Sequence, residues 1–196
     1  CFSFHPRKLI TTGEGGVVST NDPEFDARVR VLRNHGMAPS EDGQVDFVTP
    51  AGNLRLSELH AAVGLIQIER IEALLSDRLH IADGYRERLS DLVELGLELP
   101  RVPSRATPNW QSYVVRVPQG RLASELIPKL AEQGIGTNIG ARCLHKEPAY
   151  STLPHFDRSF PGADDAFDRA LALPVPCGLT ESEQDQVVEA LSTVLG

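Results

Sequence analysis

Cysteine and long apolar runs are both scarce in this sequence, and each scarcity excludes a class of protein. Only Cys1, Cys143 and Cys177 are present among 196 residues, far apart and in no CxxC pair. The sequence therefore predicts neither a disulfide framework nor a zinc site, and a reducing, cytoplasmic setting fits it best. No stretch approaches the roughly 20 apolar residues that cross a bilayer, and the N-terminus lacks the layout of a signal peptide, so we expect a soluble protein.

Basic residues are outnumbered by acidic ones. Nineteen Lys and Arg against 27 Asp and Glu leave a net charge of -8. A nucleic-acid binder usually has the opposite balance or a basic stripe, so we expect no nucleic-acid partner. Hydrophobic residues make up 41% and charged residues 23% of the chain, which is typical of a globular fold and excludes disorder, a coiled coil and a fibre.

The length suits one large domain or two small ones. Phe2 and Phe4 alternate with polar residues, which predicts a buried strand, and a glycine-rich turn leads from there into a second strand at residues 17–20. Because the chain begins with Cys1 and at once shows this pattern, we expect a fragment that lacks an N-terminal part.

Helix signals follow at three places in the first half of the chain. Asp22 and Pro23 predict a helix start, with an end at Gly36. Residues 37–50 are polar and aperiodic, which predicts a functional loop. Ser57 predicts the cap of the next helix. A further helix is expected at residues 76–92, with one apolar side formed by Leu79, Ala82, Leu89 and Leu92.

After three prolines at 100, 103 and 108, the pattern changes to short strands that alternate with helices. Strands are predicted at residues 113–117 and 136–138, and a helix at residues 124–132. Thr180 and Glu183 form a capping box before an apolar helical stripe. We therefore predict a second domain over residues 76–196, of the α/β or the α+β kind, after a first domain over residues 1–75.

The densest group of reactive residues lies at the N-terminus. Lys8 follows an apolar strand, where desolvation would lower its pKa and free its amine for attack on a carbonyl. Ser3 and the N–H groups of the glycine turn could meet a phosphate. The alternative is a solvent-facing lysine beside an ordinary glycine turn, and spacing alone favours that alternative. The spacing also differs from an NTP-binding P-loop.

An ordered set of motifs along nearly the whole chain resembles one family, the pyridoxal-phosphate-dependent sugar aminotransferases called DegT/DnrJ/StrS. The matching stretches are Phe2-Ser3-Phe4-His5-Pro6-Arg7-Lys8, Thr12-Gly13-Glu14-Gly15-Gly16, Leu32-Arg33-Asn34-His35-Gly36, Gly52-Asn53-Leu54-Arg55-Leu56-Ser57-Glu58, Ala61-Ala62-Val63-Gly64-Leu65, Gly134-Ile135-Gly136-Thr137, Leu144-His145, Leu173-Pro174 and Gly178-Leu179-Thr180-Glu181. The resemblance implies the type-I, aspartate-aminotransferase-like α/β fold. Residues 1–75 would be the incomplete end of the large cofactor domain, and residues 76–196 the small C-terminal domain with its connecting helix.

The resemblance also implies roles for single residues. Lys8 would bind pyridoxal 5'-phosphate covalently and act as general acid and base, and Ser3 would hold the cofactor phosphate. Asn53 would reach the phosphate in the neighbouring subunit of a homodimer with shared active sites. Arg55 and His145 would be substrate residues. The reaction implied moves an amino group from glutamate or glutamine to a keto group of a nucleotide-linked sugar, as in the biosynthesis of amino sugars and polysaccharides.

Two departures from the family pattern bear on this expectation. Gly140 and Ala141 stand where many members have a His-Tyr pair near the substrate, so the acceptor could differ. The family's aspartate for the pyridinium nitrogen lies upstream of the lysine and is not in this sequence, so the 196 residues alone should be a poor catalyst. Other interpretations are a non-catalytic dimerisation or regulatory module of the same family, or a phosphate-binding protein without chemistry. The presence of Lys8 argues against the family's dehydratase variants.

Overall fold

The computed structural model describes residues 1–153 and 158–196, and it divides the chain into two compact units, Cys1–Glu72 and Ala73–Gly196. We call them the N-terminal unit and the C-terminal unit. The division falls inside helix α3 (Ile71–Arg88), near the boundary expected after residue 75. That the N-terminal unit is the end of the large domain of the family fold, and the C-terminal unit its small domain, stays a prediction.

A three-stranded antiparallel sheet forms the centre of the C-terminal unit. Its order is β5 (Tyr113–Arg116), β7 (Ala170–Leu173), β6 (Asn138–Ile139), with Tyr113 opposite Leu173 and Asn138 opposite Ala172. The strand expected at residues 113–117 is confirmed, and the one expected at 136–138 lies slightly later. The central strand β7 was not predicted. Since every pairing is antiparallel, the α+β alternative describes this unit.

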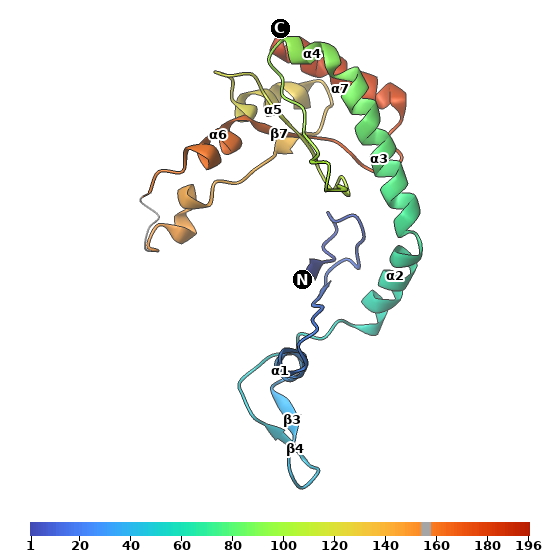
Figure 1. Cartoon of the computed structure of the whole chain (residues 1–196), viewed down its shortest axis with the longest axis vertical. Helices are drawn as coiled ribbons and strands as arrows, with labels where there is room; N and C mark the ends of the chain where they lie inside the picture. Colours follow the sequence, from blue (N-terminus) through green and yellow to red (C-terminus); the bar gives the residue numbers. More distant parts are fainter. Residues whose placement is uncertain (154–157) are drawn as a thin grey trace. The chain divides into compact units, whose positions relative to one another are not determined.

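The other elements of the C-terminal unit are helices and two short 3-10 turns (Figure 1). They are α3, α4 (Ser90–Glu94), α5 (Ala123–Glu132), η1 (Leu144–Lys146), η2 (Pro148–Tyr150), α6 (Pro161–Arg169) and α7 (Glu181–Leu195). Helix α7 packs along α3, where the Gln184 side-chain amide donates a hydrogen bond to the Ile81 carbonyl at 2.9 Å. The predicted capping box of Thr180 and Glu183 is confirmed at the start of α7.

The hydrophobic core lies in the C-terminal unit. Its largest fully buried side chains include Tyr85 of α3, Tyr113 of β5, Leu126 of α5, Leu171 of β7 and Leu191 of α7. The helix expected at residues 76–92 is divided into α3 and α4. Its predicted apolar side is only partly right, because Leu79 is half exposed.

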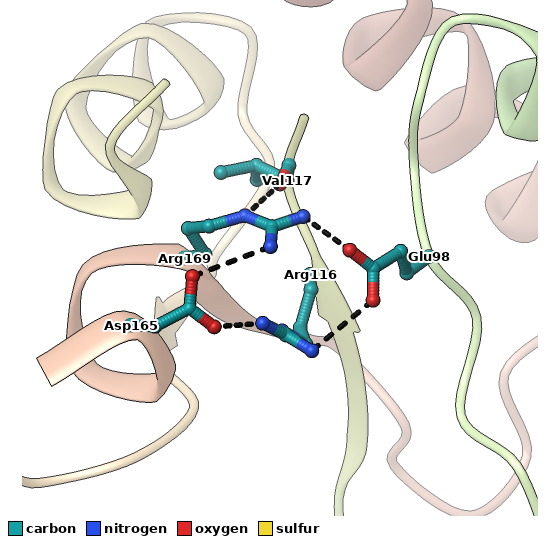
Figure 2. Close-up of polar contacts among 5 residues, drawn as sticks. All are labelled: Glu98, Arg116, Val117, Asp165 and Arg169. Atoms are coloured by element: carbon teal, nitrogen blue, oxygen red, sulfur yellow. Dashed lines mark hydrogen bonds and ion pairs between the residues drawn. The ribbon is translucent and has the colours of Figure 1, made fainter. Parts of the chain in front are cut away.

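An ion-pair network joins the edge of this core to the loop before the sheet (Figure 2). Arg169, whose side chain is only 5% exposed, donates to the Val117 carbonyl at 2.8 Å and pairs with Glu98 and Asp165. Arg116 pairs with the same two acids. The hydrogen bond from Arg169 is the main cause that holds the pKa of Glu98 below its usual value.

The N-terminal unit has helices with well-defined caps. Helix α1 (Pro23–Arg33) begins after Asp22, whose side chain accepts from two N–H groups of the first turn. Helix α2 (Glu58–Glu69) begins after Ser57, whose hydroxyl accepts from the His60 N–H at 3.3 Å. Both predicted caps are therefore confirmed.

The predicted strand pair at the N-terminus is also confirmed, but not its burial. Strand β1 (Phe2–Ser3) pairs antiparallel with β2 (Gly16–Val17). Phe2 is 62% exposed and Val17 45%, so the expectation of a buried strand is wrong within this chain. No hydrophobic residue among residues 1–72, all of which the structure describes, is buried.

Residues 37–50 form a hairpin, where the sequence predicted an aperiodic loop. Strand β3 (Met37–Pro39) pairs with β4 (Val45–Phe47). The turn between them is closed by the Ser40 N–H, which donates to the Gln44 carbonyl, and Gly43 adopts a φ of 80° there. The turn chemistry of Ser40, Asp42 and Gly43 is the signal that the periodicity argument missed. None of the described helices has the length and apolar character needed to cross a membrane.

Candidate active site

The predicted lysine lies on a loop closed by backbone hydrogen bonds. Phe4 N–H donates to the Gly15 carbonyl at 2.9 Å, and Thr12 N–H donates to the Phe4 carbonyl at 3.1 Å. Lys8 N–H donates to the His5 carbonyl at 2.9 Å and forms a tight turn. The loop between β1 and β2 is thus a fixed structure that presents Lys8 at its outer end.

Two residues anchor the base of this loop: Thr12, which is buried, and Gly15. The Thr12 hydroxyl donates to the Glu14 carbonyl at 2.8 Å. A Cβ on Gly15 would lie 2.7 Å from the Leu56 side chain and 2.8 Å from the Thr12 hydroxyl, and its φ of 146° disfavours other residues. Gly15 therefore permits close packing on Leu56 within the protein, and the binding of a phosphate by the N–H groups of this turn stays a prediction.

Lys8 is exposed on this loop, and Ser3 is exposed at the end of strand β1, where the loop begins. The Lys8 amine has no hydrogen-bond or ion-pair partner in the part of the chain that the structure describes. The expected desolvation by apolar neighbours is therefore not found within this chain. The Ser3 hydroxyl oxygen accepts from the His5 N–H at 3.3 Å, which leaves its own hydrogen available to a ligand.

A second group is built where two motifs distant in sequence meet. His35 N–H donates to the Gly52 carbonyl and Leu54 N–H to the Arg33 carbonyl, both at 2.9 Å, which pairs Asn34 with Asn53. Beside this pair, Gly36 has a φ of 75° and lets the backbone at Thr49 come close. A Cβ there would lie 1.8 Å from the Thr49 carbonyl oxygen.

Asn53 and Arg55 are both exposed in this second group. The Asn53 side-chain oxygen accepts from the Arg55 N–H at 3.3 Å, so its NH₂ group remains available as a donor. The Arg55 guanidinium donates to the Asn34 side-chain oxygen. No hydrogen bond or ion pair among the described residues connects Asn53 or Arg55 with Lys8 or Ser3.

A hollow of about 470 Å³ lies beside Arg55 in the N-terminal unit. Arg33 and Asn34 line it, together with Ala27, Arg30, Val31, Met37 and Pro39. Arg30 is already paired with Asp26 at 2.8 Å, so Arg33 and Arg55 are the cations best placed for a ligand. The hollow has the electrostatic character of a site for an anionic group.

His145 lies in the C-terminal unit. Its side chain is partly buried, whereas the other predicted site residues are exposed. Its Nε2 lies 3.1 Å from the Asp164 carboxylate and its ring packs on Phe160 at 5.0 Å. The buried Cys143 thiol lies 3.5 Å from the same carboxylate oxygen. Burial raises the pKa of Cys143, and the hydrogen bond from Lys146 lowers the pKa of Asp164. The sequence argument missed this grouping, whose only local signal is the Cys143-x-His145 spacing.

The match to known proteins decides the family. Residues 1–192 match the DegT/DnrJ/EryC1/StrS aminotransferase family. The chain belongs to this family. The resemblance seen in the motifs is therefore confirmed, and with it pyridoxal phosphate as the cofactor of the family.

Solved structures agree with this assignment. The chain is 30% identical to S. venezuelae DesV, solved with a ketimine intermediate, with a TM-score of 0.85 and coverage of 99% of this chain and 50% of that one. The chain is 29% identical to Spr1654 of Streptococcus pneumoniae in its PLP form, with a TM-score of 0.84 and coverage of 99% of this chain and 50% of that one. It is 26% identical to the sugar aminotransferase CalS13 from Micromonospora echinospora, with a TM-score of 0.83 and coverage of 97% of this chain and 50% of that one. The type-I fold is confirmed, and the chain spans about half the length of these proteins.

The exposed donors of the N-terminal unit fit pyridoxal phosphate chemically. A primary amine without a partner can attach to an aldehyde, and a serine hydroxyl with a free hydrogen can donate to a phosphate. Ser3 ends strand β1, and Lys8 lies on the hydrogen-bonded loop that follows it. The fit supports Lys8 and Ser3 as the residues that hold the cofactor.

Proposed function

We propose that the complete protein is a pyridoxal-phosphate-dependent aminotransferase that transfers an amino group from glutamate or glutamine to a keto group of a nucleotide-linked sugar. The observation that carries this proposal is the exposed amine of Lys8 on a closed loop, in a chain that matches the family over residues 1–192.

The residues would divide the work as follows. Bound pyridoxal phosphate supplies an electron sink for the carbon that loses its proton. Lys8 would hold the cofactor and then move the proton, because its exposed amine can both bind the aldehyde and act as a base once released. Ser3 would donate a hydrogen bond to the phosphate. His145 is proposed as a substrate residue with less support, because its ring nitrogen already contacts Asp164.

The test of the Lys8 role is a reductive label on the complete protein. Borohydride treatment followed by peptide mapping should place the pyridoxyl group on Lys8. The internal controls are Lys129 and Lys146, the other two lysines of this sequence. Both lie outside the family's cofactor-lysine motif and should stay unlabelled. A label on either control, or a full-length protein without a visible-absorbing cofactor, would contradict the proposal.

The nucleotide part of the substrate is supported by the hollow that Arg33 and Arg55 line, since guanidinium groups bind phosphates in a two-pronged geometry. Arg33→Gln in the complete protein should raise KM for a keto sugar nucleotide and leave KM for the amino donor unchanged. Arg28→Gln is the matched control, because Arg28 lies on the same helix but does not line this hollow. Equal KM values in the two variants would contradict nucleotide binding there.

We propose further that Asn53 serves the active site of a neighbouring subunit in a homodimer. It is supported by the exposed Asn53 amide, which no hydrogen bond or ion pair among residues 1–153 and 158–196 connects with Lys8. Mixing inactive Lys8→Ala subunits with inactive Asn53→Ala subunits should restore part of the activity, because some mixed dimers regain one intact site. No recovery after verified subunit exchange would argue against shared sites.

A further inference from the structure

Three side chains with metal-ligating atoms meet in the C-terminal unit. The Cys143 Sγ lies 3.5 Å from His145 Nε2 and 3.5 Å from Asp164 Oδ1. His145 Nε2 and Asp164 Oδ1 are 3.1 Å apart, which closes the triangle. Cys143 and His145 come from the start of η1, whereas Asp164 comes from the first turn of α6. The tertiary structure thus brings together ligands 19 and 21 residues apart in the sequence.

These separations match the edges of a metal tetrahedron. Bond lengths of ~2.3 Å to sulfur, ~2.0 Å to imidazole nitrogen and ~2.0 Å to carboxylate oxygen imply edges of about 3.5, 3.5 and 3.3 Å. The three measured edges differ from these by about 0.2 Å or less. Cys143 Sγ also lies 3.4 Å from His145 Nδ1, so the imidazole ring must turn until one ring nitrogen points at the ion.

We propose that Cys143, His145 and Asp164 form a binding site for a thiophilic divalent cation such as Zn²⁺. A mixed set of sulfur, nitrogen and oxygen ligands suits Zn²⁺ or Co²⁺ and not Mg²⁺ or Ca²⁺, which prefer oxygen ligands alone. On binding, three metal-ligand bonds form and the Cys143 thiol proton passes to the solvent. A water molecule would take the fourth position. This inference does not depend on the proposed aminotransferase function.

The exposure of the three residues favours an ion over a reactive cysteine. Cys143 is 1% exposed, so a large substrate cannot reach its sulfur. The Asp164 side chain is 32% exposed, and an ion can enter from that side.

Lys146 is the competitor of a bound cation. Its ammonium lies 2.7 Å from the same Asp164 oxygen that would bind the ion. Because the Lys146 side chain is 47% exposed, it can leave this oxygen for solvent at small cost. Removal of Lys146 should therefore strengthen metal binding, whereas removal of a true ligand should weaken it.

The experiment uses Co²⁺ as the probe, added to the 196-residue chain without a polyhistidine tag after treatment with a chelator. A thiolate-to-cobalt charge-transfer band with the intense visible bands of tetrahedral Co²⁺ is expected, and Zn²⁺ should displace both. Absence of the charge-transfer band in the wild-type protein would overturn the proposal, whether or not any variant folds.

Variants assign the ligands. Cys143→Ser should abolish the charge-transfer band, and His145→Gln and Asp164→Asn should each weaken Co²⁺ binding by at least about tenfold. Cys177→Ser, at an exposed cysteine, is the matched control and should keep the band. Lys146→Met should bind Co²⁺ more tightly, by up to about fivefold. A band that survives Cys143→Ser or disappears in Cys177→Ser, in protein shown to be folded by circular dichroism, would overturn the assignment. So would binding in Lys146→Met that is no tighter.

Discussion

Arg169 is the buried centre of the network in Figure 2, and its replacement by methionine should destabilise the C-terminal unit. The Arg169 side chain is 5% exposed, and its Nε donates to the Val117 carbonyl at 2.8 Å. Methionine keeps most of the apolar stem but leaves that carbonyl unpaired, which costs about 1–3 kcal/mol.

The two acidic partners contribute less than this buried carbonyl. Glu98 and Asp165 are 48% and 34% exposed, so water can solvate them once the guanidinium is gone. Their lost ion pairs add roughly 1 kcal/mol at most. We therefore expect Arg169→Met to lower the free energy of unfolding by about 1–4 kcal/mol.

Urea unfolding followed by tryptophan fluorescence measures this loss directly. The sequence has one tryptophan, Trp110, which is 6% exposed in the core of the C-terminal unit, so the signal reports on that unit. The control is Arg86→Met. Arg86 pairs with Asp83 at 2.8 Å, but its side chain is 53% exposed, so the expected loss is only about 0.3–0.5 kcal/mol. A loss for Arg169→Met within about 0.5 kcal/mol of the control, at an unchanged denaturant slope, would refute the reasoning.

Other predictions concern acid stability, a helix cap, a strained turn and the two units. The hydrogen bond from Arg169 is the main cause that lowers the pKa of Glu98 in the folded protein below its ordinary value of 4.5. The contribution of Glu98 to the free energy of unfolding is therefore complete above about pH 4.5, and it is lost as the pH falls through the lower pKa of the folded state. Glu98→Gln should flatten that part of the stability profile, measured by urea unfolding at several pH values. Thr180→Ala removes the α7 capping box and should cost about 1 kcal/mol in the same assay, whereas Thr193→Ala, near the other end of α7, should cost less. Gly36→Ala in the complete protein should reduce activity or soluble yield, because its Cβ would clash with the Thr49 carbonyl. Limited proteolysis of the 196-residue chain should cleave residues 1–72 first, because every buried hydrophobic residue described lies in the C-terminal unit; prior cleavage inside α3, α5 or α7 would contradict this.

Local chemistry was sufficient to predict several elements from the sequence. The caps at Asp22, Ser57 and Thr180 are decided by side chains that bond N–H groups within three residues of themselves, so short windows contain the whole signal. Motif order along the chain was likewise sufficient to identify the family and to single out Lys8.

Other features depend on partners that lie far away in the sequence, and only the tertiary structure decided them. Strand β7 pairs with both β5 and β6, and its residues are buried on both faces, so the alternation that marks a half-buried strand is missing from its short apolar run. Lys8 has an apolar strand before it in the sequence, but the loop that closes through Gly15 leaves it exposed in this chain. The group of Cys143, His145 and Asp164 exists only because α6 returns to η1, since Asp164 lies 21 residues from that cysteine in the sequence. Long-range contacts of this kind come from the packing of whole elements, which residues adjacent in sequence do not determine.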